Sequence, residues 1–248
     1  RSPVDIAVIH LPRISNFTDF APLESHPALG VRYVGRTEEL RHPDLVILPG
    51  TKSTTADLIW LRESGLEAAI LKLAAVGTPV LGICGGYQML GEVLEDPDGV
   101  EGTLRRIKGM GLLPCSTVFA PEKIRTRVRA ETTGGPLGGA ALDGYEIHMG
   151  LTQVRGEPFC RLESGLEDGC RQGNVLGTYL HGLFDSGALT DRLARWLCGR
   201  KGIDPGSAAP ELYRDYQARQ YDLLAEGLRN AMDMEQIYRI LKEGGGGK

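Results

Sequence analysis

A cysteine followed by two glycines is the most reactive pattern in this chain. Cys84 stands in residues 80–91, VLGICGGYQMLG, where a mostly apolar run precedes it and a helix-like run follows. This order predicts a strand, a sharp turn and a helix, which is the setting of a nucleophile elbow. A neighbouring glycine permits strained backbone angles, and helix N–H groups aimed at the sulfur favour the reactive thiolate. The segment therefore indicates a cysteine nucleophile, with a buried structural cysteine as the alternative.

A histidine near a strand end supplies the base that a thiol nucleophile needs. His181 lies just past the sequence NVLGTYL, which predicts a strand over residues 174–180. A thiol paired with an imidazole is the equipment of acyl transfer through a thioester. His148 ends another strand-like run and is the rival base, and a structural role is the alternative for both. The remaining histidines have no comparable setting: His10, His26 and His42.

Two glycines are placed to stabilise developing negative charge. Gly50 follows an apolar, β-branched run at residues 44–48, and Gly85 follows Cys84 directly. The carboxyl ends of parallel strands meet at one edge of a sheet, so we expect Gly50, Cys84 and His181 to converge there. The N–H groups of Gly50 and Gly85 would then form an oxyanion hole. A polar, aromatic segment at residues 11–20 is expected at the same edge as a ligand loop, or as an ordinary structural loop.

Alternating strands and helices must position these groups. Apolar runs predict strands at residues 5–10, 31–34, 44–48 and 80–83, and a helical pattern ends at Gly77 before the last of them. This alternation predicts an α/β fold with an open, mostly parallel sheet flanked by helices.

The second half of the chain has a different pattern. A half-exposed strand is predicted at residues 124–130, and residues 201–210 are rich in Gly, Pro, Ser and Ala. Amphipathic helices follow over residues 212–241, and the glycine run at residues 244–247 is predicted to fray. We therefore predict a catalytic domain at residues 1–200, then a linker and C-terminal helical extension at residues 201–248.

Composition narrows the class of protein. The chain has 248 residues, a net charge of −4, 42% hydrophobic and 24% charged residues, which is ordinary for a globular protein. The charge gives no reason to expect nucleic acid or a membrane as a partner. Five cysteines without a CxxC pair argue against a metal site and suit a reducing cytoplasm. No signal peptide or membrane-spanning run is apparent, and a start at Arg1 suggests a fragment.

Five blocks in order carry a resemblance to a known family. They are LPRISNFTDFAPL at residues 11–23, LPGTKST at 48–54, GICGGYQMLG at 82–91, GYEIHMG at 144–150 and GTYLHGLF at 177–184. The chain resembles the glutaminase half of class I, triad-type glutamine amidotransferases, and most closely their cobyric acid synthase branch. The resemblance runs from about residue 4 through the C-terminal helices, and it implies a flavodoxin-like fold.

The resemblance implies roles for particular residues. Cys84 would be the nucleophile and His181 the base, while Gln88, one helical turn after Cys84, would hold the substrate glutamine. No cofactor is expected on this chain. An N-terminal, ATP-dependent synthetase domain that binds Mg²⁺ would use the ammonia to amidate corrinoid carboxylates in cobalamin biosynthesis. Docking of that domain on residues 16–20 and 51–54 is expected to activate a slow glutaminase.

One departure leaves the group that orients the base open. Many class I enzymes have a glutamate two residues after the histidine, where this chain has Leu183. Asp185, Glu146 or a backbone carbonyl could serve instead. Alternative functions are the glutaminase of cobyrinic acid a,c-diamide synthase or of a lipid II amidotransferase, a non-catalytic binding module, and a cysteine peptidase. The NFTD sequence at residues 16–19 favours the cobyric branch.

Overall fold

The computed structural model describes residues 2–204, 213–233 and 239 and divides the chain into two compact units, Arg1–Pro210 and Glu211–Lys248. In the second unit, helix α7 (Tyr213–Ala231) lies within the predicted helical segment and exposes Leu223, Leu224 and Leu228. The predicted glycine fraying at residues 244–247 and most of the predicted linker lie outside the described residues. Among the described residues, no helix has the length and apolar character needed to cross a membrane.

A six-stranded sheet in the first unit confirms the predicted α/β architecture. Its order is β11-β12-β4-β3-β1-β2, and every neighbouring pair is parallel except β11 with β12. The strands are β1 (Val4–Ile9), β2 (Leu29–Val34), β3 (Leu45–Leu48), β4 (Val80–Ile83), β11 (Cys170–Gln172) and β12 (Val175–Thr178).

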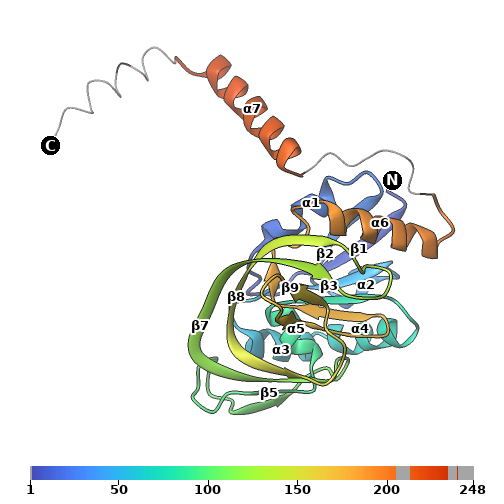
Figure 1. Ribbon diagram of the computed structural model, residues 1–248, viewed down its shortest axis with the longest axis vertical. Helices are drawn as coiled ribbons and strands as arrows, with labels where there is room; N and C mark the ends of the chain where they lie inside the picture. Colours follow the sequence, from blue (N-terminus) through green and yellow to red (C-terminus); the bar gives the residue numbers. More distant parts are fainter. Residues whose placement is uncertain (1, 205–212, 234–238, 240–248) are drawn as a thin grey trace. The chain divides into compact units, whose positions relative to one another are not determined.

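Helices cover both faces of this sheet, because its inner strands are apolar on both sides (Figure 1). Along β1, Ile6 and Val8 pack with α1 and α6, whereas Ala7 and Ile9 pack with the group of α3, α4 and α5. The helices in chain order are η1 (Phe17–Phe20), α1 (Ala21–Glu24), α2 (Thr37–Leu40), α3 (Thr54–Glu63), α4 (Leu66–Ala75), α5 (Gly85–Leu90) and α6 (Ala188–Arg200).

A second, seven-stranded sheet was not predicted from the sequence. Its two long strands, β7 (Cys115–Thr132) and β8 (Ala141–Val154), run antiparallel side by side as curved ribbons in Figure 1. The predicted half-exposed strand at residues 124–130 is one part of β7. The shorter members are β5 (Val93–Glu95), β6 (Arg106–Lys108), β9 (Cys160–Leu162), β10 (Glu167–Asp168) and β13 (Leu180–His181).

This second sheet corrects the predicted setting of the base. A single strand was expected over residues 174–180, with His181 beyond its end. Instead the chain leaves the central sheet after Thr178, and β13 pairs with β8, where His181 lies opposite Tyr145. Both segments are apolar, so the change of sheet leaves no mark in the hydrophobic pattern.

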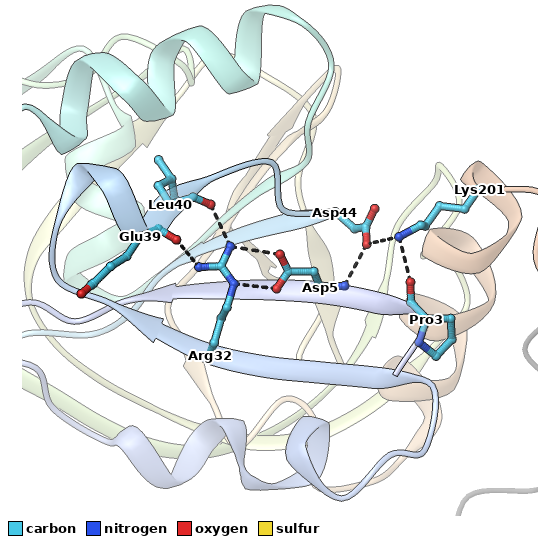
Figure 2. Close-up of polar contacts among 7 residues, drawn as sticks. All are labelled: Pro3, Asp5, Arg32, Glu39, Leu40, Asp44 and Lys201. Carbon is cyan, nitrogen blue, oxygen red and sulfur yellow. Dashed lines mark hydrogen bonds and ion pairs between the residues drawn. The ribbon is translucent and has the colours of Figure 1, made fainter. Parts of the chain in front are cut away.

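An arginine fork ties the amino-terminal half of the central sheet to α2 (Figure 2). The Arg32 guanidinium on β2 forms two hydrogen bonds with the Asp5 carboxylate on β1, at 2.7 and 3.0 Å. It also donates to the carbonyl oxygens of Glu39 and Leu40 at the end of α2. One side chain therefore satisfies helix-end carbonyls while it pairs with a carboxylate, a geometry that suits a planar guanidinium.

Lys201 fastens the end of α6 to the start of the sheet (Figure 2). Its Nζ donates to the Pro3 carbonyl at 2.8 Å and to Asp44 Oδ2 at 2.7 Å. The same Asp44 oxygen accepts the backbone N–H of Asp5 at 2.8 Å. Segments almost 200 positions apart in the sequence are thus joined at the edge of the sheet away from Cys84.

Replacing Arg32 by alanine is expected to lower the free energy of unfolding by about 1–2 kcal/mol, because the pair with Asp5 is partly exposed and screened but the helix-end carbonyls also lose a donor. Arg32→Lys should restore less than half of this loss, since an ammonium cannot form the fork. Urea unfolding measures both. Arg161→Ala, which breaks the exposed pair with Glu167, is the control and should change little. An Arg32→Ala chain as stable as the parent would contradict the prediction.

Candidate active site

Cys84 occupies a strained turn between β4 and α5. Its backbone has φ 53° and ψ −111°, outside the common regions for a residue with a side chain. A Cβ on Gly86 would collide with the carbonyl oxygen of Leu48, so the turn can pack against β3 only with glycine at that position. The backbone N–H of Cys84 donates to the Thr178 carbonyl at 2.8 Å. The turn therefore has the geometry of a nucleophile elbow, with a half-buried thiol.

His181 is held by a carboxylate that the sequence analysis did not single out. Asp19, in η1, lies with Oδ2 2.7 Å from Nδ1 of His181, and its Oδ1 accepts the N–H of Gly182 at 3.3 Å. A carboxylate accepts hydrogen bonds here, so Nδ1 carries the proton and Nε2 is left for other partners. The imidazole and the carboxylate are both buried, at 1% and 5% exposure.

The thiol of Cys84 completes this chain of contacts. The side chains of Cys84 and His181 lie together, since a Cβ on Gly50 would be within 4 Å of both, and the interaction with Cys84 raises the pKa of the His181 ring. The thiol also lies 3.3 Å from the Ile147 carbonyl of β8, to which it can donate. The thiol of Cys84, the imidazole of His181 and the carboxylate of Asp19 therefore lie one after the other in space, in the order of a catalytic triad.

These partners set the protonation of the base. Burial lowers the pKa of His181, but the hydrogen bonds and charges of Asp19 and Cys84 outweigh it and raise the pKa from 6.5 to about 9. An imidazole in this setting readily accepts a proton and keeps it as imidazolium.

Two further side chains hold the imidazole. The Tyr145 ring stacks on it, with centroids 5.4 Å apart and an angle of 21° between planes. The Asn16 amide nitrogen lies 3.1 and 3.3 Å from its two ring nitrogens. Asn16 has φ 52°, and among the described non-glycine residues only Asn16, Arg41 and Cys84 have positive φ. Two of these three strained residues therefore contact His181, which marks the site as a place where strain is retained.

Gly50 and Gly85 both reach the site, as predicted from their place after strands. A Cβ on Gly50 would lie 3.1 Å from Cε1 of His181 and 3.7 Å from Cβ of Cys84. A Cβ on Gly85 would lie 2.6 Å from the Thr51 methyl group. The loop after β3 thus packs directly against the elbow, where a side chain at Gly85 would collide with Thr51 and one at Gly50 would press on the His181 ring.

Gln88 lies beside the elbow in a buried network. Its Oε1 accepts from the Thr54 hydroxyl at 3.0 Å, while its Nε2 lies 3.1 Å from both the Met149 carbonyl and the Tyr179 hydroxyl. The side chain thus joins α3, α5 and β8. Its 3% exposure shows that it forms part of the wall behind the thiol.

His148, the rival base, is engaged elsewhere. Its ring stacks on Tyr179 with centroids 3.7 Å apart, and its Nδ1 donates to the Gly150 carbonyl at 3.2 Å. Burial lowers the pKa of His148, the Gly150 carbonyl opposes this, and the charge of His181 lowers it further. His148 is therefore suited to stay neutral behind the site.

The groups proposed to orient the base need correction. The sequence leaves Asp185, Glu146 or a backbone carbonyl as candidates, but Nδ1 donates its hydrogen bond to Asp19, 162 positions away in the sequence. The signal that could have found it was present: Asp19 stands in the predicted ligand loop, next to Asn16. Asp185 lies nearby, since a Cβ on Gly182 would be 3.2 Å from its Oδ2.

In the described residues, no group of three or more His, Cys, Asp or Glu side chains is arranged to hold a metal ion. The expectation that this chain carries no metal stays a prediction.

Comparisons with known proteins agree on one family. A model of the CobB/CobQ-like glutamine amidotransferase domain matches residues 5–189. Cobyric acid synthase from Ruminiclostridium cellulolyticum is 49% identical over 97% of this chain and 49% of its own length. Cobyric acid synthase from Salmonella typhimurium is 45% identical, again over 97% of this chain and 49% of the relative. The chain therefore spans about half the length of the curated relatives it matches.

Solved structures agree with the predicted fold. A crystal structure of a glutamine amidotransferase has a TM-score of 0.57 and 22% identity, over 80% of this chain and 99% of that one. The structure of PurLQS from Thermotoga maritima has a TM-score of 0.59 and 19% identity, over 80% and 99% of the two chains. At these identities the likeness shows a shared fold alone.

In an NMR titration of the histidine rings, His181 is expected to keep its proton up to about pH 9, whereas burial lowers the pKa of His26 and His148 below 6.5. Asp19→Asn should lower the pKa of His181, because a raising hydrogen bond and charge are lost. Because the pKa of His181 is higher in the folded state, its protonation stabilises the fold. This contribution is fully present below pH 6.5 and is lost as the pH rises through about 9. The free energy of unfolding should therefore fall over that interval, less so in Asp19→Asn. A His181 ring that loses its proton below pH 6.5 would contradict the assignment.

Proposed function

Because this chain belongs to the family of CobB/CobQ-like glutamine amidotransferase domains, we propose that it hydrolyses glutamine at Cys84 with His181 as the base. The observation that carries the proposal is the connected series of Cys84, His181 and Asp19 at a strained turn. Asp19 positions the imidazole, in the place of the glutamate that this chain lacks. We propose that these three residues, which come from three separate segments, act together as a catalytic triad.

The reaction follows from this geometry. Nε2 of His181 holds the proton that has left the Cys84 thiol, as the imidazolium that its raised pKa favours, and the thiolate sulfur attacks the side-chain amide carbon of glutamine. The tetrahedral intermediate collapses, the C–N bond breaks, and the nitrogen leaves as ammonia with the proton from His181. A thioester remains on Cys84. Water then attacks it as His181 removes a proton, which releases glutamate and returns the proton to the thiol.

The negative oxygen of the intermediate needs donors that are already in place. We propose the N–H groups of Gly50 and Gly85 for this role, because both glycines pack closely at the elbow beside Cys84 and His181. Gln88 is proposed to contact glutamine. Both ends of its amide already have partners in the protein, so a direct contact requires exchange of one of those hydrogen bonds.

The wider reaction is proposed from the relatives. Proteins named cobyric acid synthase match 97% of this chain at 44–49% identity, which favours this function over cobyrinic acid a,c-diamide synthase, lipid II amidotransferase, a binding module or a peptidase. The ammonia would then serve an ATP- and Mg²⁺-dependent synthetase domain that amidates corrinoid carboxylates in cobalamin biosynthesis. Residues 1–200, which include the matched residues 5–189, would be the glutaminase part of such a protein.

The surface proposed for docking of that domain is continuous with the base. The loop after β1 and the loop after β3 are joined, because Ser15 N–H donates to the Gly50 carbonyl at 2.9 Å and Lys52 N–H to the Arg13 carbonyl at 3.0 Å. Phe17 stands on this surface with 64% exposure beside a cavity of ≈ 440 Å³. It lies between Asn16 and Asp19, which both contact His181. A partner that binds Phe17 can therefore influence the base through a short segment.

Cys84→Ser is expected to abolish glutamine hydrolysis and leave the fold intact, because little alkoxide forms at neutral pH. An electrophilic glutamine analogue should label Cys84 in the parent chain, as mass spectrometry of its peptides would show. Burial raises the pKa of the other four thiols and should keep them unreactive: Cys115, Cys160, Cys170 and Cys198.

A matched pair of histidine variants tests the choice of base. His181→Ala should lower turnover by about a hundredfold to ten-thousandfold. His148→Ala should cost less, because that ring contacts Tyr179 and Gly150. A larger loss with His148→Ala, or labelling at another cysteine, would overturn the assignment. Peptide cleavage in place of glutamine turnover would favour a peptidase.

The isolated chain is expected to hydrolyse glutamine slowly and to accelerate when the separately produced synthetase domain, corrinoid and ATP are added. A partner changes the rate only as far as it binds the active arrangement better. Phe17→Ser should remove most of this acceleration, whereas Leu166→Ser, at a site of similar exposure (66%), should not. Glutamate release measures both. If the chain hydrolyses glutamine equally fast alone and in the complex, the proposed activation by the synthetase domain is wrong. If Phe17→Ser and Leu166→Ser have equal effects, the synthetase domain does not dock at Phe17.

A further inference from the structure

We propose that Thr178, held by Asp168, is a positioning residue that sets the distance between the thiol of Cys84 and the imidazole of His181. The inference rests on the roles proposed for those two residues. It adds a group that touches neither glutamine nor the reacting atoms.

Thr178 lies where the chain passes from one sheet to the other. It is the last residue of β12, in the central sheet beside Ile83, and Leu180 begins β13 in the second sheet. Only Tyr179 separates the two strands. The nucleophile follows β4 in the first sheet and the base stands on β13 in the second, so their separation depends on how the chain makes this crossing.

Thr178 is bonded to both sides of the crossing. Its carbonyl accepts the N–H of Cys84 at 2.8 Å, which fixes the elbow. Its hydroxyl accepts the N–H of Leu180 at 3.1 Å, one residue before His181. The residue is fully buried, so water cannot replace either bond. One side chain and its own carbonyl thus link the backbone of the nucleophile to the backbone that carries the base.

Asp168 fixes the rotation of this hydroxyl. The Thr178 hydroxyl donates to Asp168 Oδ2, which directs its lone pairs toward Leu180. The same carboxylate accepts the N–H of Tyr179 at 3.3 Å and faces the thiol of Cys160 at 3.8 Å. Burial raises the pKa of Asp168, but these donors oppose it. The buried Asp168 therefore bonds Thr178 and Tyr179 directly, and it is linked to Leu180 through the Thr178 hydroxyl.

Removal of the hydroxyl tests the inference. Thr178→Val keeps the shape of the side chain but leaves Leu180 without its acceptor. We expect the turnover number, normalised to the amount of Cys84 that the glutamine analogue can label, to fall about tenfold to a hundredfold. KM should stay within about twofold of the parent value, because a small displacement of the base slows the reaction but does not change substrate binding. Thr178→Ser should restore most of the rate, since it keeps the hydroxyl.

A second readout separates positioning from stability. The interaction with Cys84 helps to raise the pKa of His181, so an NMR titration should show a lower pKa in Thr178→Val and a normal one in Thr178→Ser. The control is Thr132→Val in the second sheet, where a buried hydroxyl accepts Ala140 N–H at 2.8 Å and bonds the Leu137 carbonyl. It should lower stability without changing the turnover number or the pKa of His181.

Each outcome has a distinct meaning. If Thr178→Val does not fold, Thr178→Cys, with a weaker donor of similar size, should fall between Ser and Val in rate. Unchanged turnover and an unchanged pKa of His181 in Thr178→Val, or equal effects in Thr132→Val, would overturn the inference. A parent chain that fails to hydrolyse glutamine and shows no labelling at Cys84 would instead overturn the proposed function.

Discussion

The buried hydrogen bond between Asp19 and His181 is the interaction on which the geometry of the site depends. It joins the loop after the first strand to a strand near the end of the first unit, and its 2.7 Å length leaves little freedom for the ring. Because Nδ1 carries a proton and donates it in a hydrogen bond to the carboxylate, the opposite nitrogen is left for the thiol. The strained backbone of Asn16 belongs to the same loop, so the strain is retained where it positions the base.

The two sheets divide the chemistry between them. The central sheet brings Gly50 and Cys84 to one edge through β3 and β4, as expected for a parallel arrangement. The second sheet supplies the base on β13, the Tyr145 ring that stacks on it, and the Ile147 carbonyl beside the thiol. The proposed active site therefore lies where the two sheets meet, and Thr178 stands at the point where the chain passes from one sheet to the other.

Close approach of backbones explains why glycine is so frequent here. Gly86 lies against the Leu48 carbonyl, and a Cβ on Gly144 would collide with the carbonyl oxygen of His181. Both positions bring an element of the site nearer than a side chain would allow. At the opposite edge of the sheet, charged side chains hold neighbouring segments together instead: Arg32 pairs with Asp5, and Lys201 pairs with Asp44.

The sequence by itself determined the elements that local pattern controls. The elbow at Cys84, the strands of the parallel sheet and the approach of Gly50 to Cys84 and Gly85 all follow from apolar runs, glycines and the rule that parallel strand ends meet. Only the tertiary structure decided that Asp19 orients the base, that β13 belongs to a second sheet, and that Gln88 is built into a buried wall. These outcomes depend on contacts between residues far apart in the chain. Hydrophobic period reports which face of a strand is buried but not which strand lies beside it.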